Sequence, residues 1–160
     1  MGIASFIEEV SKALTLHVGH IMIMIIKNDV YRQVMATVGH FRPESGGIIA
    51  LDKEGVISDF YFDAEAGFGK ASYKPTRLSI QNYIRAHWSV GDTRFCGIVH
   101  SHPLCNTCVP SYIDVEMAQK IMEANNMALF YLLMVKGSEI ALYRVSQNDA
   151  QCKQVELEIK

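Results

Sequence analysis

The chain has 160 residues, of which 49% are hydrophobic and 20% charged, a composition typical of one globular domain. We therefore expect a single domain over residues 1–160. The formal net charge of −2 and the scattering of the 15 lysines and arginines argue against the basic surface on which nucleic-acid affinity depends. A protein or a small molecule is the expected partner.

The N-terminus and the apolar runs argue against a membrane protein. The strongest apolar run, residues 21–26, is far shorter than the ~20 residues that span a bilayer. Glu8 and Glu9 stand where a signal peptide carries positive charge. We therefore expect a cytoplasmic protein, whose cysteines stay reduced or bind metal rather than form disulfides.

Hydrophobic periodicity predicts the elements of the first half of the chain. Helices are assigned where apolar residues recur at spacings of three and four, and strands where short apolar runs lie between turn residues. The expected elements are, in order, an amphipathic helix at 3–14, a buried strand at 20–26, a helix from Asn28 or Asp29 to Val38 that Gly39 ends, and a hairpin of strands at 48–52 and 56–62.

The second half of the chain predicts further helices and strands. They are a helix at 76–88 that follows Pro75, a strand at 95–102, a helix from Ser111 to about Asn125, a hairpin of strands at 128–135 and 140–145 around Gly137, and an edge strand at 154–159. Some of these strands are joined by hairpins and others by helical crossovers. The expected fold class is therefore α/β, with a mixed β-sheet covered by helices.

The stretch GIVHSHPLCNTCVPSYID, residues 97–114, concentrates side chains that can bind a metal. Residues i and i+2 of a strand point to the same face, so His100 and His102 project side by side at the end of their predicted strand. Two imidazoles in this position form half of a zinc site. An isolated His-x-His, however, is more often a pair of structural histidines.

The helix that follows favours the metal. At 100° per residue, Asp114 falls within the apolar stripe formed by Met117, Ala118, Ile121 and Met122. A carboxylate in that stripe points inward, and its burial without a partner is costly, so it needs a cation. A metal shared with the two histidines would supply one.

Ser111 and Asp114 also fit a helix N-cap. Ser-x-x-Asp directly after Pro110 approximates a capping box, and an acidic residue in the first turn suits the positive end of a helix. This role is compatible with metal binding, because the Ser111 hydroxyl can face the metal while the residue caps the helix.

Two competing zinc sites would use the cysteines. Cys105-x-x-Cys108 could join the two histidines in a closed, structural site, which would leave the inward carboxylate without a partner. A zinc deaminase would use Pro-Cys-x-x-Cys and an upstream His-x-Glu, but Leu104 interrupts the first motif and the second does not occur. We expect the pair to be loop residues near a substrate cleft, and Cys96 and Cys152 to be structural thiols.

A catalytic zinc site needs a general base. Three protein ligands and one open position allow zinc to lower the pKa of a bound water to ~7, and a nearby group must then take the proton. The candidate is Glu44 in the loop segment RPESGGIIA, beside Gly46 and Gly47, which permit close approach. Taken alone, Glu44 would more often be a solvated loop charge.

Together these residues resemble the JAMM (MPN-plus) zinc metalloproteases, whose signature is a glutamate far upstream of His-x-His-Pro-x7-Ser-x2-Asp. The chain matches this signature without a gap from His100 to Asp114. PESGGII is similar to the family's glutamate segment, with Glu44 at the catalytic position. The resemblance covers roughly residues 18–145.

The resemblance implies a role for each residue. His100, His102 and Asp114 would bind one Zn²⁺ per chain. Glu44 would accept a proton from the zinc-bound water and return it to the leaving amine, and Ser111 would help to hold the oxyanion. The resemblance also implies a JAMM/MPN fold similar to that of the cytidine deaminases.

The resemblance implies cleavage of the isopeptide or peptide bond that follows the C-terminal glycine of a ubiquitin-like or sulfur-carrier protein. The short single domain and the seven-residue loop between Pro103 and Ser111 resemble the compact prokaryotic branch, which implies E1-like and E2-like conjugation enzymes as partners. Two alternatives stay open. One is a non-catalytic MPN-type scaffold that binds through the N-terminal helix, and the other is a small-molecule amidase or cysteine-releasing hydrolase with the same site.

Overall fold

The computed structural model describes most of the chain, namely residues 22–40, 44–66, 73–102, 107–147 and 152–160. The helix expected at residues 3–14 lies outside the described residues. Within them, the order of helices and strands agrees with the order predicted from the sequence, and the protein is a mixed α/β fold.

The described residues contain seven strands, which form one sheet. The strands are β1 (Ile23–Ile26), β2 (Gly46–Leu51), β3 (Ile57–Phe62), β4 (Arg94–Ser101), β5 (Leu129–Lys136), β6 (Glu139–Ser146) and β7 (Lys153–Ile159). Their order in space is β1-β3-β2-β4-β5-β6-β7, and the sheet closes into a barrel. β2–β3 and β5–β6 are the antiparallel hairpins that the sequence predicted, whereas β4 and β5 are parallel.

The prediction that residues 154–159 form an edge strand is wrong. β7 pairs with β6 in antiparallel fashion and with β1 in parallel fashion, in the register Ile23↔Glu156 to Ile26↔Ile159. This pairing satisfies backbone groups that an edge would leave open, and it is what closes the sheet. Closure of the sheet was not predicted, because the sequence of a short apolar strand does not indicate which strand pairs with it.

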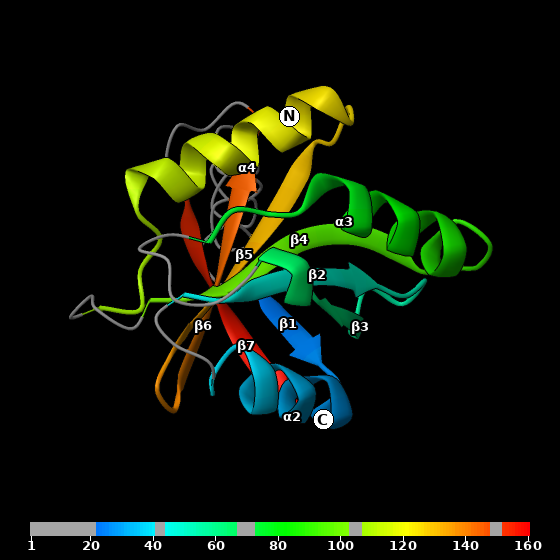
Figure 1. The fold of residues 1–160 in the computed structure, drawn as a ribbon. Coiled ribbons are helices and arrows are strands. Elements are labelled where there is room, and N and C mark those ends of the chain that lie inside the picture. Colours follow the sequence, from blue (N-terminus) through cyan, green and yellow to red (C-terminus); the bar gives the residue numbers. More distant parts are fainter. Residues whose placement is uncertain (1–21, 41–43, 67–72, 103–106, 148–151) are drawn as a thin grey trace, which may run out of the picture.

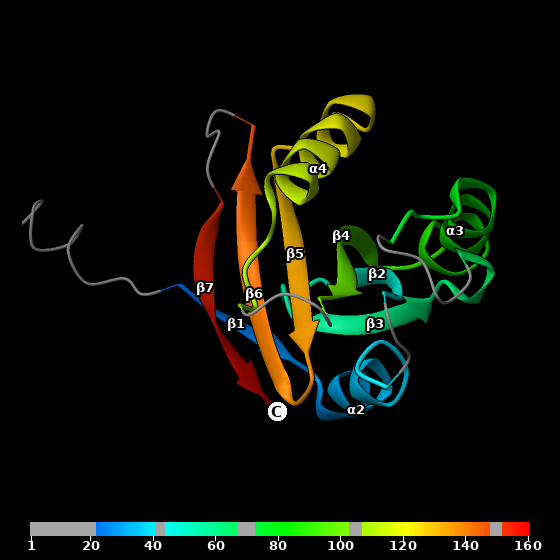
Figure 2. The same cartoon turned by 60° about the vertical axis from the view of Figure 1, so that its left-hand side comes forward.

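A short 3₁₀ helix (Ala64–Ala66) follows β3, and the described part of the chain has three longer helices around the sheet. They are α2 (Asn28–Thr37), α3 (Arg77–Tyr83), which continues as a π-helical turn (Ile84–Trp88), and α4 (Tyr112–Ala124). The N-cap of α2 is Lys27 rather than Asn28 or Asp29. Figure 1 shows α3 and α4 on one side of the strands and α2 on the other, and Figure 2 shows α4 beside β5 and β6. None of the described helices is long and apolar enough to cross a membrane.

The alternation of side chains along the central strands divides the core in two. Ile49 and Val99 pack with α2 in one cluster of buried apolar residues. Ile48 and Ile98, which are paired across β2 and β4, belong to a second cluster with α3 and α4. Because His100 follows Ile98 by two residues, it shares the face that α3 and α4 cover.

Candidate metal centre

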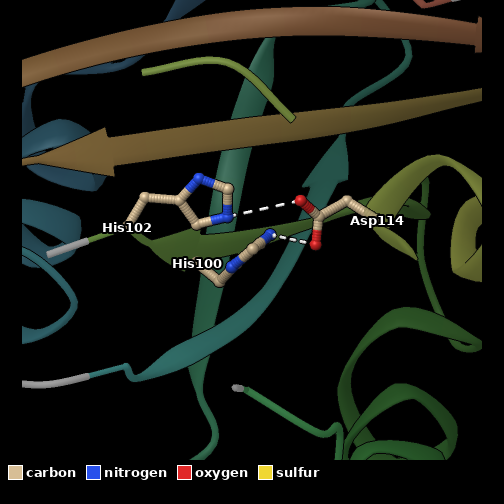
Figure 3. A group of neighbouring side chains, drawn as sticks. All are labelled: His100, His102 and Asp114. Carbon is tan, nitrogen blue, oxygen red and sulfur yellow. Dashed lines mark ion pairs between the residues drawn. The ribbon is translucent and has the colours of Figure 1, made fainter. Parts of the chain in front are cut away.

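Three side chains from two elements meet at the end of β4. Nε2 of His100 lies 3.0 Å from Oδ1 of Asp114, and Nε2 of His102 lies 3.3 Å from Oδ2 of the same carboxylate. Figure 3 shows both imidazoles pointing toward the carboxylate. One potential ligand atom from each residue lies within 4.8 Å of the others, and all three residues are buried. Among the described residues, this is a group that could hold a metal ion.

Local structure explains why these side chains converge. His100 is in β4 and His102 comes directly after it, where its backbone N–H still donates to the carbonyl of Val135 at 2.9 Å. The extended backbone therefore continues, and both imidazoles project to the same face. Asp114 lies in the first turn of α4, whose buried positions Asp114, Ala118 and Met122 recur every fourth residue. The inward direction predicted from helical periodicity is the one observed.

The electrostatics of the group favour a cation. Burial is the largest single influence on Asp114 and would raise its pKa, but its interactions with His100, His102 and Ser111 together outweigh burial and hold the pKa far below its ordinary value. The contact with Asp114 raises the pKa of His102, although burial opposes this shift, and the charge of Glu44 adds to it. These shifts favour the ionised form of the carboxylate, which suits a cation as its partner.

Ser111 caps α4 and binds Asp114 at the same time. Its hydroxyl donates to Oδ2 of Asp114 at 2.7 Å, and its backbone N–H donates to the same oxygen at 2.6 Å. In return the backbone N–H of Asp114 donates to the Ser111 hydroxyl at 3.3 Å, which completes the capping box. The cap thus orients the carboxylate toward the histidines.

Glu44 lies next to this group by strand register. Gly46 pairs with His100 across β2 and β4, and the N–H of Ser101 donates to the carbonyl of Ser45 at 3.1 Å. If this antiparallel register is continued by two residues, before Gly46 and after His100, Glu44 is opposite His102 on the same face of the sheet. Oε2 of Glu44 accepts a hydrogen bond of 2.7 Å from the backbone N–H of Tyr73.

Two residues near Glu44 were not found by sequence reasoning. The Tyr73 hydroxyl donates to Oδ2 of Asp63 at 3.0 Å, and the Tyr73 ring lies 6.1 Å from that of His100, centroid to centroid. Burial, followed by the charge of Asp63, raises the pKa of Tyr73 far above its ordinary value, so the hydroxyl stays protonated. No local pattern marks these residues, because their partners are distant in the chain.

The described cysteines do not belong to the group. Cys108 is half-buried, its Sγ lies 3.3 Å from the carbonyl of Met134, and burial raises its pKa. Cys96 is buried against the carbonyl of Ile49, and its pKa is raised by the same cause. Both thiols therefore contact backbone carbonyls rather than the His-His-Asp group. Cys105 lies outside the described residues.

The three residues fit a divalent transition metal. Two imidazoles and one carboxylate are the nitrogen and oxygen donors of a three-ligand zinc site with an open position. Neither ring nitrogen of His100 makes a hydrogen bond of good geometry within the described part of the chain, although both are buried. Buried polar atoms are rarely left without partners, and a bound ion would supply one.

The fold is similar to that of a JAB1/MPN domain protein from Archaeoglobus fulgidus, with a TM-score of 0.50 and 18% sequence identity over 85% of this chain and 98% of that one. The solution structure of a protein from Desulfitobacterium hafniense matches with a TM-score of 0.57 and 15% identity, over 87% and 93%. No family model matches the sequence, and neither does any curated protein. Fold and site together define a mixed α/β protein of the JAB1/MPN fold that carries a buried His-His-Asp group.

Proposed function

We propose that this chain is a zinc-dependent peptidase or isopeptidase of the JAMM type. Its substrate would be the bond that follows the C-terminal glycine of a ubiquitin-like or sulfur-carrier protein. E1-like and E2-like conjugation enzymes are the partners that such a role implies. The likeness of this fold to the cytidine deaminases stays a prediction of the same resemblance.

One observation carries the proposal. The buried His100, His102 and Asp114 have ligand atoms within 4.8 Å of one another, and Glu44 lies two residues before Gly46, which pairs with His100. A scaffold that binds a partner through its surface has no need of a buried ligand set with a carboxylate beside it. Zinc, when bound, would polarise the scissile carbonyl and acidify the attacking water.

Glu44 would act as the general base and then as the general acid. Because Oε2 already accepts the N–H of Tyr73, we assign the proton transfer to Oε1. This oxygen would take one proton from the water as the water oxygen bonds to the carbonyl carbon. It would return the proton to the nitrogen as the C–N bond breaks, which leaves an amine and a carboxylic acid; the acid carries the second proton of the water and loses it to solvent at neutral pH.

Ser111 would donate a hydrogen bond to the oxyanion. In the structure its hydroxyl donates to Asp114, and the residue is exposed to solvent. Rotation of the hydroxyl about the Cα–Cβ bond would turn it from the carboxylate toward a substrate oxygen. The backbone hydrogen bond from Ser111 would keep Asp114 oriented after that rotation.

A groove beside the site suits an extended polypeptide. It has a volume of about 680 Å³ and lies between α3 and α4 over the sheet, with Ile48 and Ile98 on its floor. Ile98 precedes His100 by two residues on the same strand face, and Ile113, also in the lining, precedes Asp114. A polypeptide segment in this groove would therefore pass the start of α4, close in sequence to Asp114.

Exposed apolar side chains around the start of α4 favour a macromolecular substrate over a small amide. Val109, Tyr112 and Ile113 are 48%, 81% and 72% exposed. Single exposed apolar residues are normal on protein surfaces, but a group of them at the mouth of a site is typical of an interface. The small-molecule amidase is for this reason the weaker candidate.

Cleavage of a ubiquitin-like fusion protein tests the function. A fusion of a Gly-terminated ubiquitin-like domain to a reporter should be cleaved after the glycine, and a chelator should stop the reaction. Glu44→Gln should lower kcat by at least about 10²-fold, the usual contribution of a general base, with zinc content unchanged. Glu54→Gln, which alters an exposed carboxylate in the β2–β3 turn, is the matched control and should keep full activity.

Two results would contradict the proposal. Full cleavage activity in Glu44→Gln would exclude Glu44 as the general base. A zinc-loaded protein that binds ubiquitin-like domains but cleaves none of their fusions would favour the non-catalytic scaffold.

A further inference from the structure

Tyr73 contacts three parts of the candidate site at once. Its backbone N–H donates to Oε2 of Glu44 at 2.7 Å, and its ring lies 6.1 Å from the ring of His100. The ring also lies against Gly46, where an added Cβ would come within 2.5 Å of it. Tyr73 is itself only 7% exposed. One buried residue thus lies between the proposed base and a proposed metal ligand.

Asp63 holds Tyr73 from the opposite side. Oδ2 of Asp63 accepts the Tyr73 hydroxyl at 3.0 Å and the backbone N–H of Thr76 at 2.7 Å. The backbone N–H of Asp63 donates in turn to the carbonyl of Gly46 at 2.9 Å, directly after β3. Asp63 is 1% exposed, and its Oδ1 makes no hydrogen bond with any described residue. Two bonds to one oxygen therefore anchor the segment 73–76 to the sheet.

Glu44 needs such an anchor. It lies two residues before Gly46, the first residue of β2, so its backbone is outside the strand and its side chain needs a contact of its own to be fixed. A glutamate side chain that is free to rotate spends little time in the one geometry that proton transfer requires. A fixed N–H on Oε2 restricts this rotation and orients the other oxygen.

We propose that Tyr73 is the positioning residue for the Glu44 carboxylate, and that Asp63 holds Tyr73 in place. The catalytic consequence rests on the proposed function, whereas the anchoring does not. Neither residue touches the reacting atoms. Both act through the orientation of one carboxylate.

The anchoring is tested on the metal-free protein by amide hydrogen exchange. The residue 73 amide should be protected in the wild type. Tyr73→Phe removes only the hydroxyl and keeps the ring, and it should speed exchange of that amide about tenfold, as expected when one hydrogen bond is lost. Glu44→Ala removes the acceptor and should have a similar effect. Tyr31→Phe is the control, because Tyr31 lies in α2 and packs on the apolar cluster at the other face of the sheet.

The positioning is tested by kinetics on a ubiquitin-like fusion. Tyr73→Phe should lower kcat about tenfold while KM and zinc content stay at wild-type values, because only orientation of the base is lost. In a Glu44→Gln background the same substitution should cause no further decrease, since the group that it positions is gone. A purely structural role would lower activity in both backgrounds.

The outcomes separate this inference from the function on which it rests. Unchanged exchange of the residue 73 amide in Tyr73→Phe, or additive losses of kcat in the double variant, would overturn the positioning role. If amide exchange at residue 73 changes as expected but the wild type cleaves no fusion, the proposed peptidase function is wrong and the anchoring of Glu44 by Tyr73 is still supported. If the wild type cleaves and Tyr73→Phe equals it in kcat and exchange, the function stands and the positioning role fails.

Discussion

Nε2 of His100 and Oδ1 of Asp114 lie 3.0 Å apart, although one residue belongs to a strand and the other to a helix. Their side chains are only 3% and 10% exposed. A buried carboxylate held between two imidazoles is costly unless its charge is compensated, and the fold maintains this arrangement through the α4 cap. The three side chains that could hold a metal therefore lie together in the structure.

Asp114→Asn should lower zinc affinity by at least about 100-fold, because loss of even an outer partner of a metal ligand typically costs 10- to 100-fold. The amide keeps the size of the side chain but removes its charge. Isothermal titration calorimetry of the metal-free protein would measure the change. Glu116→Gln, which removes a more exposed carboxylate of the same helix, is the matched control and should bind zinc normally. Equal affinities of the two variants would exclude Asp114 as a ligand.

The stability of the metal-free protein should depend on pH through the pair His102 and Asp114. The pKa of His102 is raised in the folded state, so its contribution is fully present below the unfolded value of ~6.5 and is lost as pH rises through the folded value. The pKa of Asp114 is lowered, so its contribution is present above ~3.9 and is lost as pH falls through the folded value. The pair therefore contributes most between about pH 4 and 6.5.

Urea unfolding of the wild type and of His102→Gln would check this pH dependence. The difference in the free energy of unfolding between them should be larger at about pH 6 than at about pH 8. A difference that does not change with pH would show that the two side chains do not share a proton-linked interaction in the metal-free state.

Gly46→Ala should destabilise the protein and disturb Glu44. An added Cβ would come within 2.5 Å of the Tyr73 ring, and overpacking of this kind typically costs about 1–3 kcal/mol. Displacement of the ring would also move the N–H that binds Glu44, so kcat should fall in the fusion-cleavage assay. At Gly91 an added Cβ meets no atom within 4 Å, so Gly91→Ala should change stability by less than about 0.5 kcal/mol. Chemical denaturation of both variants measures the contrast.

The double substitution Cys105→Ser and Cys108→Ser should leave one zinc bound per chain. The proposed ligands are His100, His102 and Asp114, and the Cys108 thiol contacts a backbone carbonyl instead of this group. Metal analysis of the purified variant by mass spectrometry gives the stoichiometry. Loss of the zinc would instead favour the closed site of two cysteines and two histidines, and with it a structural role for the metal.

The order of the helices and strands could be predicted from the sequence because hydrophobic periodicity is a property of each element by itself. Alternation along β4 put His100 and His102 on one face, and the phase of α4 turned Asp114 inward, since both follow from the geometry of a single element. Closure of the sheet by β7 and β1 was missed for the opposite reason. Strand pairing is a long-range choice, and the alternating pattern of a strand shows which face is buried but not which strand lies beside it.

The candidate site shows the same division. Residue types and spacing within residues 97–114 were sufficient to select two histidines, an aspartate and a serine, because one strand, one loop and one helix cap hold them all. Only the tertiary structure decided what surrounds Glu44. The hydrogen bonds from Tyr73 to Asp63 and from Tyr73 to Glu44 join three segments, and no periodicity of the sequence indicates contacts between residues that meet only when the sheet is assembled.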